Sequence, residues 1–431
     1  MIIDGFEITG FWGRAVVKGK VHPDVTIFIG DNGTGKTTLI NLLVAALQVD
    51  VETLEAIPFD TIRISLRRPE DNRKGPVILV TREEKEVPYS IFEYTVRNEK
   101  FRIFCDIRRR RRFGRERVFI ESPRSRRRYE KLKELLDELV EISWISVYRH
   151  SPIELRDEER HRFNVDRRLD QLTTELAKFQ LKLERQIRER SQQFQREVMQ
   201  SLLYSKELDD LSNFHTIRRK ISLDAEQEMD LIRAFQELGI TGKTQQIKLH
   251  YSEIRKAMEN IKNFEQRDKP LSLSDISPLP FATRTQRILE LLRAAEEDRE
   301  AIRKPIGTFL DVLHGFVKKK TFEIDKETGE LSVNLKVGRK KEPLELFDLS
   351  SGEKQLLIQM LEVLLQEQHS MIFFADEPEL SLHVQWQVML LPALRKLNAN
   401  SQIIVATHSP DIVSDFKKNV IDMEDIVKDG V

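Results

Sequence analysis

Residues 30–37 read GDNGTGKT, which places three glycines, a lysine and a threonine at the spacing GxxxxGK[ST]. The motif follows an apolar run at 25–29 and precedes a helical pattern at 37–47. Glycines let backbone N–H groups turn toward phosphate oxygens, and the N-terminus of the following helix adds partial positive charge. The pattern therefore predicts a nucleotide-phosphate loop in which Lys36 reaches the β and γ phosphates. The residues expected to contact the nucleotide are Gly30, Asp31, Asn32, Gly33, Thr34, Gly35, Lys36, Thr37 and Thr38.

A second chemical signal is MIFFADE, residues 371–377, an apolar run that ends in two acids. Asp376 is expected to bind Mg²⁺ together with the hydroxyl of Thr37, because Mg²⁺ prefers oxygen ligands. Glu377 is expected to polarise the water that attacks the γ-phosphate. A further apolar run leads to His408, which either lies beside the phosphates at the carboxyl end of a central strand or merely caps that strand. The predicted catalytic residues are Lys36, Glu377 and His408.

A third motif, LSSGEKQ at 349–355, opens an apolar helix. Together with GDNGTGKT, FFADEPELSLH and THSP, it resembles the ATP-binding-cassette (ABC) ATPases. The similarity is greatest to the branch that contains RecF, SMC and Rad50 proteins and the overcoming-lysogenisation-defect ATPases. It covers residues 1–66 and 321–413 well, and the helical middle of the chain only in type.

The resemblance implies ATP and Mg²⁺ as cofactors and a site divided between two chains. In that family the signature helix of one subunit covers the ATP held on the phosphate-binding loop of another. Ser351 and Gly352 would then offer a hydroxyl and backbone N–H groups to the γ-phosphate. The residues expected to contact nucleotide from this motif are Ser350, Ser351, Gly352 and Glu353. A homodimer or a higher assembly of dimers is therefore expected.

Some features differ from the family pattern. Transporter cassettes usually carry LSGGQ and a short helical insert, whereas this chain has Ser351, Glu353 and more than 100 inserted helical residues. This argues against a transporter. A glutamine loop near the metal is not evident, and WISVYRHSP (144–152) is its candidate counterpart. EPELSLH (377–383) is expected to form the D-loop, in which His383 either contributes to function or only packs at a dimer contact.

The elements that must position these motifs differ along the chain. The 117 residues between Pro152 and Pro270 hold no proline, and their glycines are Gly239 and Gly242 alone, which is typical of long helices with one turn. Apolar residues follow heptad spacing on two legs. The first leg has Leu169, Leu172, Leu176, Phe179 and Leu183, and the second has Ile247, Tyr251, Ile254, Met258 and Ile261. These legs indicate a helical hairpin arm, with amphipathic helices packed on a globular body as the alternative.

Short β-rich runs at 25–29, 61–66, 76–81 and 90–96 precede the helical middle, and a strand pattern returns from residue 321. We therefore expect an α/β fold: an ABC-type P-loop ATPase core with an antiparallel β subdomain and an inserted helical, coiled-coil arm. The predicted domains are the N-terminal part of the ATPase domain at 1–150, the helical insertion at 151–320 and the C-terminal part of the ATPase domain at 321–431.

Charge is balanced overall, with 71 Lys+Arg against 71 Asp+Glu, but it is concentrated locally. Residues 102–131 contain 12 Arg and 1 Lys against 4 acids, a net charge of +9. Such a cluster attracts nucleic-acid phosphates or acidic proteins, and DNA binding without a base-reading motif should tolerate any sequence. The alternative is a solvated face that pairs with acidic helices of the same chain.

Composition limits the class of protein. Of the 431 residues 40% are hydrophobic, which is enough for a buried core, and apolar runs are too short for a membrane span. The first residues lack the pattern of a signal peptide, and the single Cys105 forms no internal disulfide. We expect a cytoplasmic protein without a membrane partner.

Three functions fit these motifs. Compact chains with LSSGEKQ and DEPELSLH resemble the ATPase subunits of bacterial antiphage systems such as Septu and PARIS, which work with a separate effector nuclease. The first expectation is therefore a nucleotide-driven sensor or switch in antiphage defence. The alternatives are a RecF/SMC-like DNA repair ATPase and an ATP-dependent scaffold that sequesters an effector. A nuclease within this chain is disfavoured because no HNH-like histidine cluster is present.

Overall fold

A computed structural model gives the structure of the chain and describes residues 1–86, 89–106, 119–120, 123–146, 157–203, 225–262, 272, 277–338 and 340–429. The chain forms two units. Unit 1 comprises residues 1–177, 308–325 and 329–431, and unit 2 comprises residues 178–307 and 326–328. The predicted insertion at 151–320 contains the main part of unit 2 and also the ends of two helices that belong to unit 1.

A five-stranded parallel sheet lies in unit 1 and carries the predicted chemical motifs at its strand ends. Its strand order is β15 (Val420–Asp422), β3 (Val25–Ile29), β14 (Gln402–Ala406), β13 (Met371–Asp376) and β9 (Glu141–Ser146). The inner strands are continuous apolar runs because both faces of a parallel sheet are covered. In the register Asp376 lies opposite Ala406 on one side and Ser146 on the other. Three strand ends therefore meet at one edge of the sheet.

An eight-stranded antiparallel sheet forms the second layer of unit 1. Its order is β16 (Val427–Asp429), β2 (Ala15–Lys20), β1 (Ile2–Phe11), β4 (Thr61–Arg67), β5 (Lys74–Glu86), β6 (Tyr89–Val96), β7 (Glu99–Asp106) and β8 (Phe119–Ile120). Helix α1 (Lys36–Gln48) is buried on nearly all sides, and its side chains share one core with residues of both sheets, such as Ile64 and Phe374. A helix with so wide an apolar surface is stable only inside such a core.

The remaining elements of unit 1 surround the two sheets. They are α2 (Val51–Ala56), α3 (Pro123–Leu139), η3 (Leu346–Asp348), α11 (Ser351–Leu364), α12 (Val384–Leu397), α13 (Pro410–Val413), η4 (Ser414–Asn419) and α14 (Met423–Ile426). A small antiparallel sheet joins β10 (Lys320–Ile324), β11 (Leu331–Val337) and β12 (Lys340–Leu344). The predicted α/β fold with an antiparallel β subdomain and long inserted helices is confirmed.

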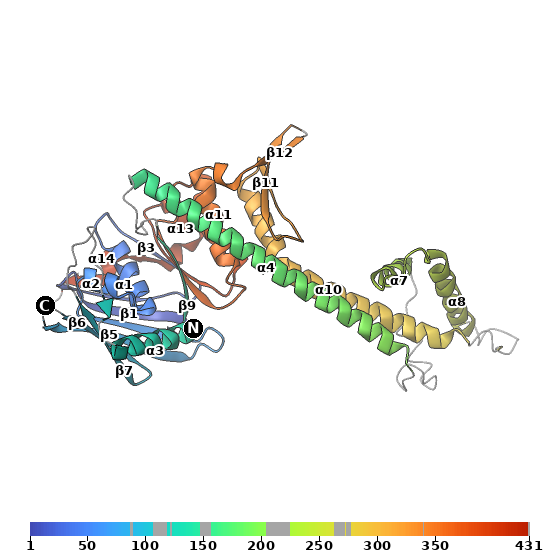
Figure 1. Cartoon of the computed structure of the whole chain (residues 1–431), viewed down its shortest axis with the longest axis horizontal. Coiled ribbons are helices and arrows are strands. Elements are labelled where there is room, and N and C mark those ends of the chain that lie inside the picture. Colours follow the sequence, from blue (N-terminus) through green and yellow to red (C-terminus); the bar gives the residue numbers. More distant parts are fainter. Residues whose placement is uncertain are drawn as a thin grey trace. The chain divides into compact units, whose positions relative to one another are not determined.

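Unit 2 consists of parts of two long helices and two shorter ones. Helix α4 (Asp157–Ser201) enters it from unit 1, and α10 (Leu279–Phe316) returns to unit 1, while α7 (Ala225–Glu237) and α8 (Thr244–Lys262) lie between them in sequence. The first predicted leg lies on α4, and its apolar side chains are buried. The return leg predicted at 247–261 forms helix α8, whose apolar residues share one cluster with residues of α4, α7 and α10. The long helix that runs beside α4 is α10 (Figure 1). Within the described residues no helix is long and apolar enough to cross a membrane.

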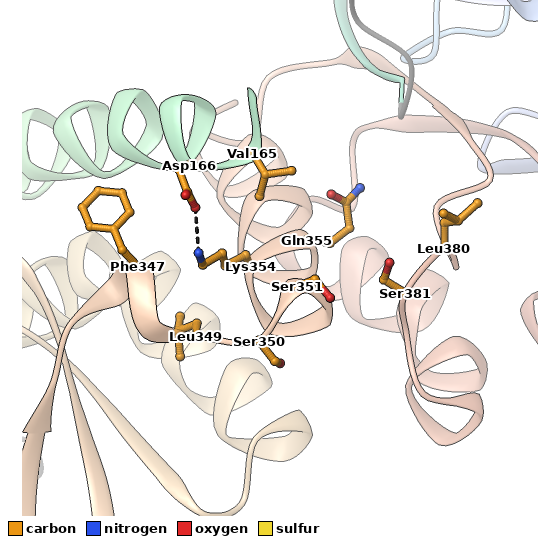
Figure 2. Close-up of a pocket in the computed structure, with 10 residues that line it drawn as sticks. All are labelled: Val165, Asp166, Phe347, Leu349, Ser350, Ser351, Lys354, Gln355, Leu380 and Ser381. Atoms are coloured by element: carbon orange, nitrogen blue, oxygen red, sulfur yellow. Dashed lines mark hydrogen bonds and ion pairs between the residues drawn. The ribbon is translucent and has the colours of Figure 1, made fainter. Parts of the chain in front are cut away.

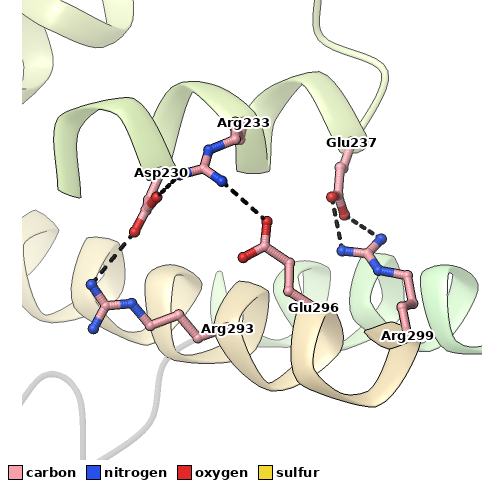
Figure 3. Close-up of polar contacts among 6 residues, drawn as sticks. All are labelled: Asp230, Arg233, Glu237, Arg293, Glu296 and Arg299. Carbon is pink, nitrogen blue, oxygen red and sulfur yellow. Dashed lines mark hydrogen bonds and ion pairs between the residues drawn. The ribbon is translucent and has the colours of Figure 1, made fainter. Parts of the chain in front are cut away.

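Ion pairs fasten α7 to α10 within unit 2 (Figure 3). The carboxylate of Asp230 accepts from Arg233 and from Arg293, and its side chain is 8% exposed. The guanidinium of Arg299 donates to both carboxylate oxygens of Glu237, at 2.8 Å each. Bidentate pairs of this kind fix the register of two elements more strictly than apolar contact does. The charges of α7 therefore specify where it lies on α10.

Candidate nucleotide site

The GDNGTGKT segment forms a tight loop between β3 and α1. Gly30, Gly33 and Gly35 have φ angles of 145°, 86° and 96°, in the left-handed range that favours glycine. A Cβ atom on Gly35 would lie 2.8 Å from the indole of Trp12. The hydroxyl of Thr34 donates to the carbonyl oxygen of Asp31 at 2.9 Å and closes the loop. These constraints produce a cradle of backbone N–H groups at the N-terminus of a helix, as phosphate binding requires.

Lys36 lies with its ammonium group inside this loop. Its Nζ donates to the carbonyl oxygens of Gly30 at 2.8 Å and Asp31 at 3.0 Å, and the residue is 5% exposed. Burial lowers the pKa of Lys36, while the nearby carboxylates of Glu377 and Asp376 act in the opposite direction. The negative charge of a bound phosphate would offset the cost of burying the Lys36 ammonium. The loop and Lys36 therefore fit the phosphates of a nucleotide.

The hydroxyl of Thr37 and the carboxylate of Asp376 come together from opposite ends of the chain. Thr37 Oγ1 donates to Asp376 Oδ1 at 3.2 Å. Burial raises the pKa of Asp376 to about 6; the Thr37 hydrogen bond lowers it, and the charges of Glu377 and Glu379 raise it further. Oxygen ligands that face a phosphate loop suit Mg²⁺, which usually keeps few protein ligands and several from substrate and water. The described residues contain no cluster of three or more metal-ligating side chains, so a cation here would need phosphate oxygens.

Glu377 and His408 occupy the ends of neighbouring strands. Glu377 follows β13, has a φ of 48°, and donates its backbone N–H to Ala406 at 2.8 Å. The left-handed conformation turns the chain sharply at this residue. His408 lies just after β14, and the side chain is exposed. Thr407, immediately before it, donates its N–H to Phe28 of β3 at 3.1 Å. The fold thus brings both predicted catalytic residues to the sheet edge that carries Asp376.

The remaining residues of the phosphate loop differ in exposure. Asp31, Asn32 and Gly33 are exposed at the turn, whereas Thr38 is half-buried in the first turn of α1. The backbone at this turn is open to a ligand, since a Cβ atom built on Gly33 would meet no atom within 4 Å apart from those of its chain neighbours. The predicted phosphate loop therefore has the accessibility that a nucleotide needs.

The LSSGEKQ motif begins helix α11 with a complete capping box. Ser350 Oγ accepts from the N–H of Glu353 at 3.3 Å, and Glu353 Oε2 accepts from the N–H of Ser350 at 2.8 Å. The carboxylate of Glu353 also accepts from Lys320 Nζ at 2.7 Å. Burial alone would raise the pKa of Glu353, but these bonds lower it overall. The carboxylate of Glu353 therefore supports the start of the motif, and contact of this residue with nucleotide stays a prediction.

A pocket of about 390 Å³ opens beside the start of α11 (Figure 2). Its polar side carries Ser350, Ser351, Ser381 and an ion pair in which Lys354 Nζ lies 2.7 Å from Asp166. Its apolar side carries Val165, Phe347, Leu349 and Leu380. None of its lining residues belongs to the loop at 30–38. The signature motif therefore offers a surface of its own, separate from the phosphate loop of the same chain.

Helix α11 is held in place by contacts that the motif pattern did not indicate. Arg168 of α4 donates Nε to Glu362 at 2.7 Å, and Ser143 of β9 donates to the other oxygen of Glu362 at 3.0 Å. A Cβ atom on Gly352 would lie 2.4 Å from the carbonyl oxygen of Ser381. The start of the signature helix thus lies directly against the segment that follows β13.

That segment, the predicted D-loop, is fixed from both ends. Gln359 of α11 is fully buried and donates Nε2 to the carbonyl oxygen of Pro378 at 2.8 Å. His383 is exposed and caps α12 by accepting from the N–H of Gln385 at 3.3 Å. Its imidazole therefore has a local structural role in the described chain. The motif itself carried no sign of the buried Gln359, which only the packing of α11 identifies.

Two other sequence predictions are met only in part by described residues. The WISVYRHSP segment begins on β9, directly beside β13, and its residues 147–152 lie outside the described residues. Most of the basic segment at 102–131 also lies outside them. Within its described part, Arg102 pairs with Glu83 at 2.9 Å and Glu93 at 3.0 Å, so this arginine is a partner of its own sheet.

Comparison with known proteins gives the family. Residues 1–413 match the family described as AAA ATPase domain. The chain belongs to this family. Membership in it accounts for a phosphate loop after β3 and an acidic end on β13, two parallel strands of this AAA ATPase domain that flank β14. Among curated proteins, no relative matches the sequence.

Two solved structures resemble this AAA ATPase domain at low identity. One is an Smc head domain with an extended coiled coil, bound to the C-terminal domain of ScpA, from Pyrococcus furiosus; it is 12% identical, with 98% of this chain and 93% of that chain covered and a TM-score of 0.39. The other is an Smc head domain with a coiled coil and joint from Pyrococcus yayanosii; it is 14% identical, with 98% and 94% covered and a TM-score of 0.43.

Proposed function

We propose that this AAA ATPase binds ATP with Mg²⁺ and hydrolyses it to ADP and phosphate at a site shared by two copies of the chain. The observation that carries the proposal is the separation of two half-sites on one chain. Lys36, Thr37, Asp376 and Glu377 gather at the edge of the parallel sheet. Ser350 and Ser351 line a pocket that includes none of the phosphate loop. A second copy would bring the missing half to each.

Each residue has a distinct role in this proposal. Lys36 neutralises charge on the β and γ phosphates, while Thr37 and Asp376 hold Mg²⁺, which would supply electrostatic stabilisation of the phosphates. Glu377 accepts a hydrogen bond from the attacking water and polarises it. His408 lies at the same sheet edge and donates toward the γ-phosphate. From the other copy, Ser351 and the N-terminus of α11 add donors to the same phosphate.

For the biological role we propose a nucleotide-driven sensor or switch in antiphage defence that works with a separate effector nuclease. Its support is the likeness of LSSGEKQ and DEPELSLH to the ATPase subunits of such systems. A RecF/SMC-like repair ATPase and a scaffold that sequesters an effector are the competing roles. Phosphate release over many turnovers favours the switch or repair roles, whereas binding of ATP without turnover favours the scaffold.

Mixing two inactive variants tests the shared site. Lys36→Ala removes the phosphate half-site, and Ser351→Arg blocks the signature half-site. Each alone should be inactive, but mixed dimers regain one intact site and at most about half the activity of a wild-type dimer. Ser332→Arg, an exposed serine on β11, is the control and should keep full activity. If mixed dimers form, as shown by cross-linking of differently tagged chains, but release no phosphate, the shared-site proposal is wrong.

We further propose that the basic segment binds a polyanion, either DNA or an acidic protein that imitates it. Its support is the net charge of +9 over 102–131 and, in the described part, the exposed Arg126, Arg127 and Arg128 on the first turns of α3. Replacing Arg109–Arg112 or Arg126–Arg128 by serine should weaken binding of labelled duplex and flatten its dependence on salt. Equal binding by the substituted protein at every salt concentration would leave the segment as a solvated basic face.

A further inference from the structure

One carboxylate oxygen holds the turn that carries His408. Glu379 Oε1 accepts from the hydroxyl of Thr407, from the N–H of His408 at 3.2 Å and from the N–H of Ser409 at 3.3 Å. Glu379 belongs to the segment after β13, whereas the three donors follow β14. The carboxylate therefore ties the ends of two neighbouring strands together, on the side of the sheet where Asp376 and Glu377 lie.

A second side chain supports the same turn. Ser409 Oγ donates to Gln387 Oε1 at 2.6 Å, and Gln387 Nε2 donates to the carbonyl oxygen of Leu382 at 3.0 Å. Gln387 lies on α12, and Leu382 lies in the predicted D-loop. Both supports of the turn thus come from the chain that follows Glu377, and neither is among the predicted site residues.

The imidazole of His408, in contrast, is exposed and forms no hydrogen bond with a described residue. Its position relative to a phosphate is consequently set by its backbone. Thr407 is fully buried and bonded to Phe28, so the strand before the turn is fixed, and Glu379 determines the course of the chain after it.

The other oxygen of Glu379 indicates that stability alone does not explain this residue. Oε2 is buried and has no hydrogen-bond partner among the described residues. An unsatisfied buried acceptor destabilises the folded chain, because it has lost its hydrogen bonds to water. A buried carboxylate at this position is thus costly to the fold, which points to a role in the site.

We propose that Glu379 is a positioning residue that sets the place of His408 at the γ-phosphate through its Oε1 hydrogen bonds. The inference rests on the proposed ATP hydrolysis. In this proposal Glu379 acts through the position of Oε1 and its capacity to accept hydrogen bonds, and the negative charge of the carboxylate has no role. Gln387 acts beside it as the second support of the turn.

Two substitutions of Glu379 distinguish the position of its acceptor oxygen from the charge of its carboxylate. Glu379→Gln keeps an acceptor oxygen at the same distance and removes the charge, whereas Glu379→Asp keeps the charge and withdraws the oxygen by one methylene. We expect the Gln variant to keep kcat within about 3-fold, and the Asp and Ala variants to lose about 10- to 100-fold, since a displacement of about 1 Å at a reacting centre has effects of this size. The KM for ATP should change by less than about 3-fold, because the phosphate loop is untouched.

A double-mutant cycle with His408→Ala tests whether Glu379 acts through the histidine. In the His408→Ala background, Glu379→Asp should lower kcat by less than about 2-fold, because nothing is left to position. A purely structural role would instead give the same fold-loss in both backgrounds. Glu342→Gln on β12 and Gln385→Ala on α12 are exposed controls and should match the wild type.

The outcomes distinguish this inference from the proposed function. Gln387→Ala should lower kcat in the same direction as Glu379→Asp and should also lose its effect without His408. Suppose that wild-type protein hydrolyses ATP and that His408→Ala is impaired. The positioning role is then wrong if Glu379→Gln is as inactive as Glu379→Ala. It is also wrong if the losses in kcat from Glu379→Asp and His408→Ala multiply in the double variant. If wild-type protein releases no phosphate, or His408→Ala is fully active, the proposed function of this sheet edge is itself wrong.

Discussion

The hydroxyl of Thr37 donates a hydrogen bond to the carboxylate of Asp376 across 3.2 Å, although the two residues are 339 positions apart. The contact joins the first helical turn after the phosphate loop to the end of β13. It exists because β3, β14 and β13 are adjacent parallel strands whose carboxyl ends lie at one edge. The contact provides the oxygen pair at which a Mg²⁺ ion would sit beside the nucleotide.

Substitution of Lys36 should impair ATP binding, whereas substitution of Glu377 should impair hydrolysis. Lys36→Ala removes the buried ammonium from the loop and should weaken ATP binding by about 10- to 100-fold, since hydrogen bonds to charged groups contribute roughly 1.5–3 kcal/mol. Glu377→Gln should bind ATP normally and lower kcat by about 10²- to 10⁴-fold, because it loses the base that polarises water. Binding of a labelled ATP analogue and steady-state phosphate release separate the two. Normal turnover by Glu377→Gln would exclude it as the base.

Asp376 should destabilise the metal-free protein at neutral pH. Its pKa of about 6 in the folded chain lies above its ordinary value of 3.8, so folding favours the protonated form. The stability that the protonated group contributes is fully present below pH 3.8 and is lost as the pH rises through 6. Asp376→Asn should therefore raise the free energy of unfolding at pH 7.5 by about 3 kcal/mol, at roughly 1.4 kcal/mol for each tenfold change in proton affinity.

Urea unfolding with EDTA and without nucleotide, at pH 4 and at pH 7.5, measures this effect. The advantage of the Asn variant should disappear at the lower pH, where Asp376 is largely protonated in the folded protein. The same variant should lose Mg²⁺-dependent hydrolysis, because an amide is a weaker ligand for a hard cation. An Asn variant that is less stable than the wild type at pH 7.5 would show that the carboxylate is not under electrostatic strain.

Gly352 has no room for a side chain. Gly352→Ala would place a Cβ atom 2.4 Å from the Ser381 carbonyl oxygen and should push the D-loop from the signature helix. We expect a loss of about 1–3 kcal/mol in stability, as for other overpacked sites. Gly307→Ala, in α10 with nothing within 4 Å, is the matched control and should stabilise by about 0.5–1 kcal/mol. Thermal unfolding compares them, and equal stability of both variants would contradict the close approach.

The Arg299–Glu237 pair should stabilise the α7–α10 contact in unit 2. Arg299 is 14% exposed and Glu237 is 30% exposed. A double-mutant cycle with Arg299→Met and Glu237→Gln should give a coupling of about 1–2 kcal/mol, read from hydrogen exchange of α7. The exposed pair Arg185–Glu189 on α4 is the control and should give about 0.5 kcal/mol or less. Equal couplings for the two pairs would mean that partial burial does not strengthen the Arg299–Glu237 pair.

Much of the fold followed from local patterns. The apolar runs at 25–29 and 371–376 are strands, because such continuous runs must be covered on both faces. The heptad leucines at 169–183 lie buried on one face of α4. Apolar spacing also predicted the helix at 247–261, but it did not show that α10 is the long helix beside α4. The spacing of apolar residues shows which face of a helix is apolar, but it does not show which other helix packs against that face.

The sequence by itself was sufficient to identify the residues that we propose for the chemistry. A phosphate loop requires glycines with positive φ and a lysine at a fixed spacing, and these are local demands that Gly30, Gly33, Gly35 and Lys36 meet within a few residues. The capping box of Ser350 and Glu353 is equally local. The bond from Lys320 to the Glu353 carboxylate was not predictable in this way, since sequence spacing does not connect residues from separate elements.

Tertiary structure alone decided how these groups are held together. Glu379 and Thr407, Asp166 and Lys354, and Thr37 and Asp376 are each brought together by strand order and helix packing. A hydrogen bond requires a distance of about 3 Å between donor and acceptor. Once the core has formed, residues that are far apart in the sequence can lie at that distance. The buried apolar runs select one arrangement of the strands, and that arrangement fixes which polar side chains meet at the sheet edge.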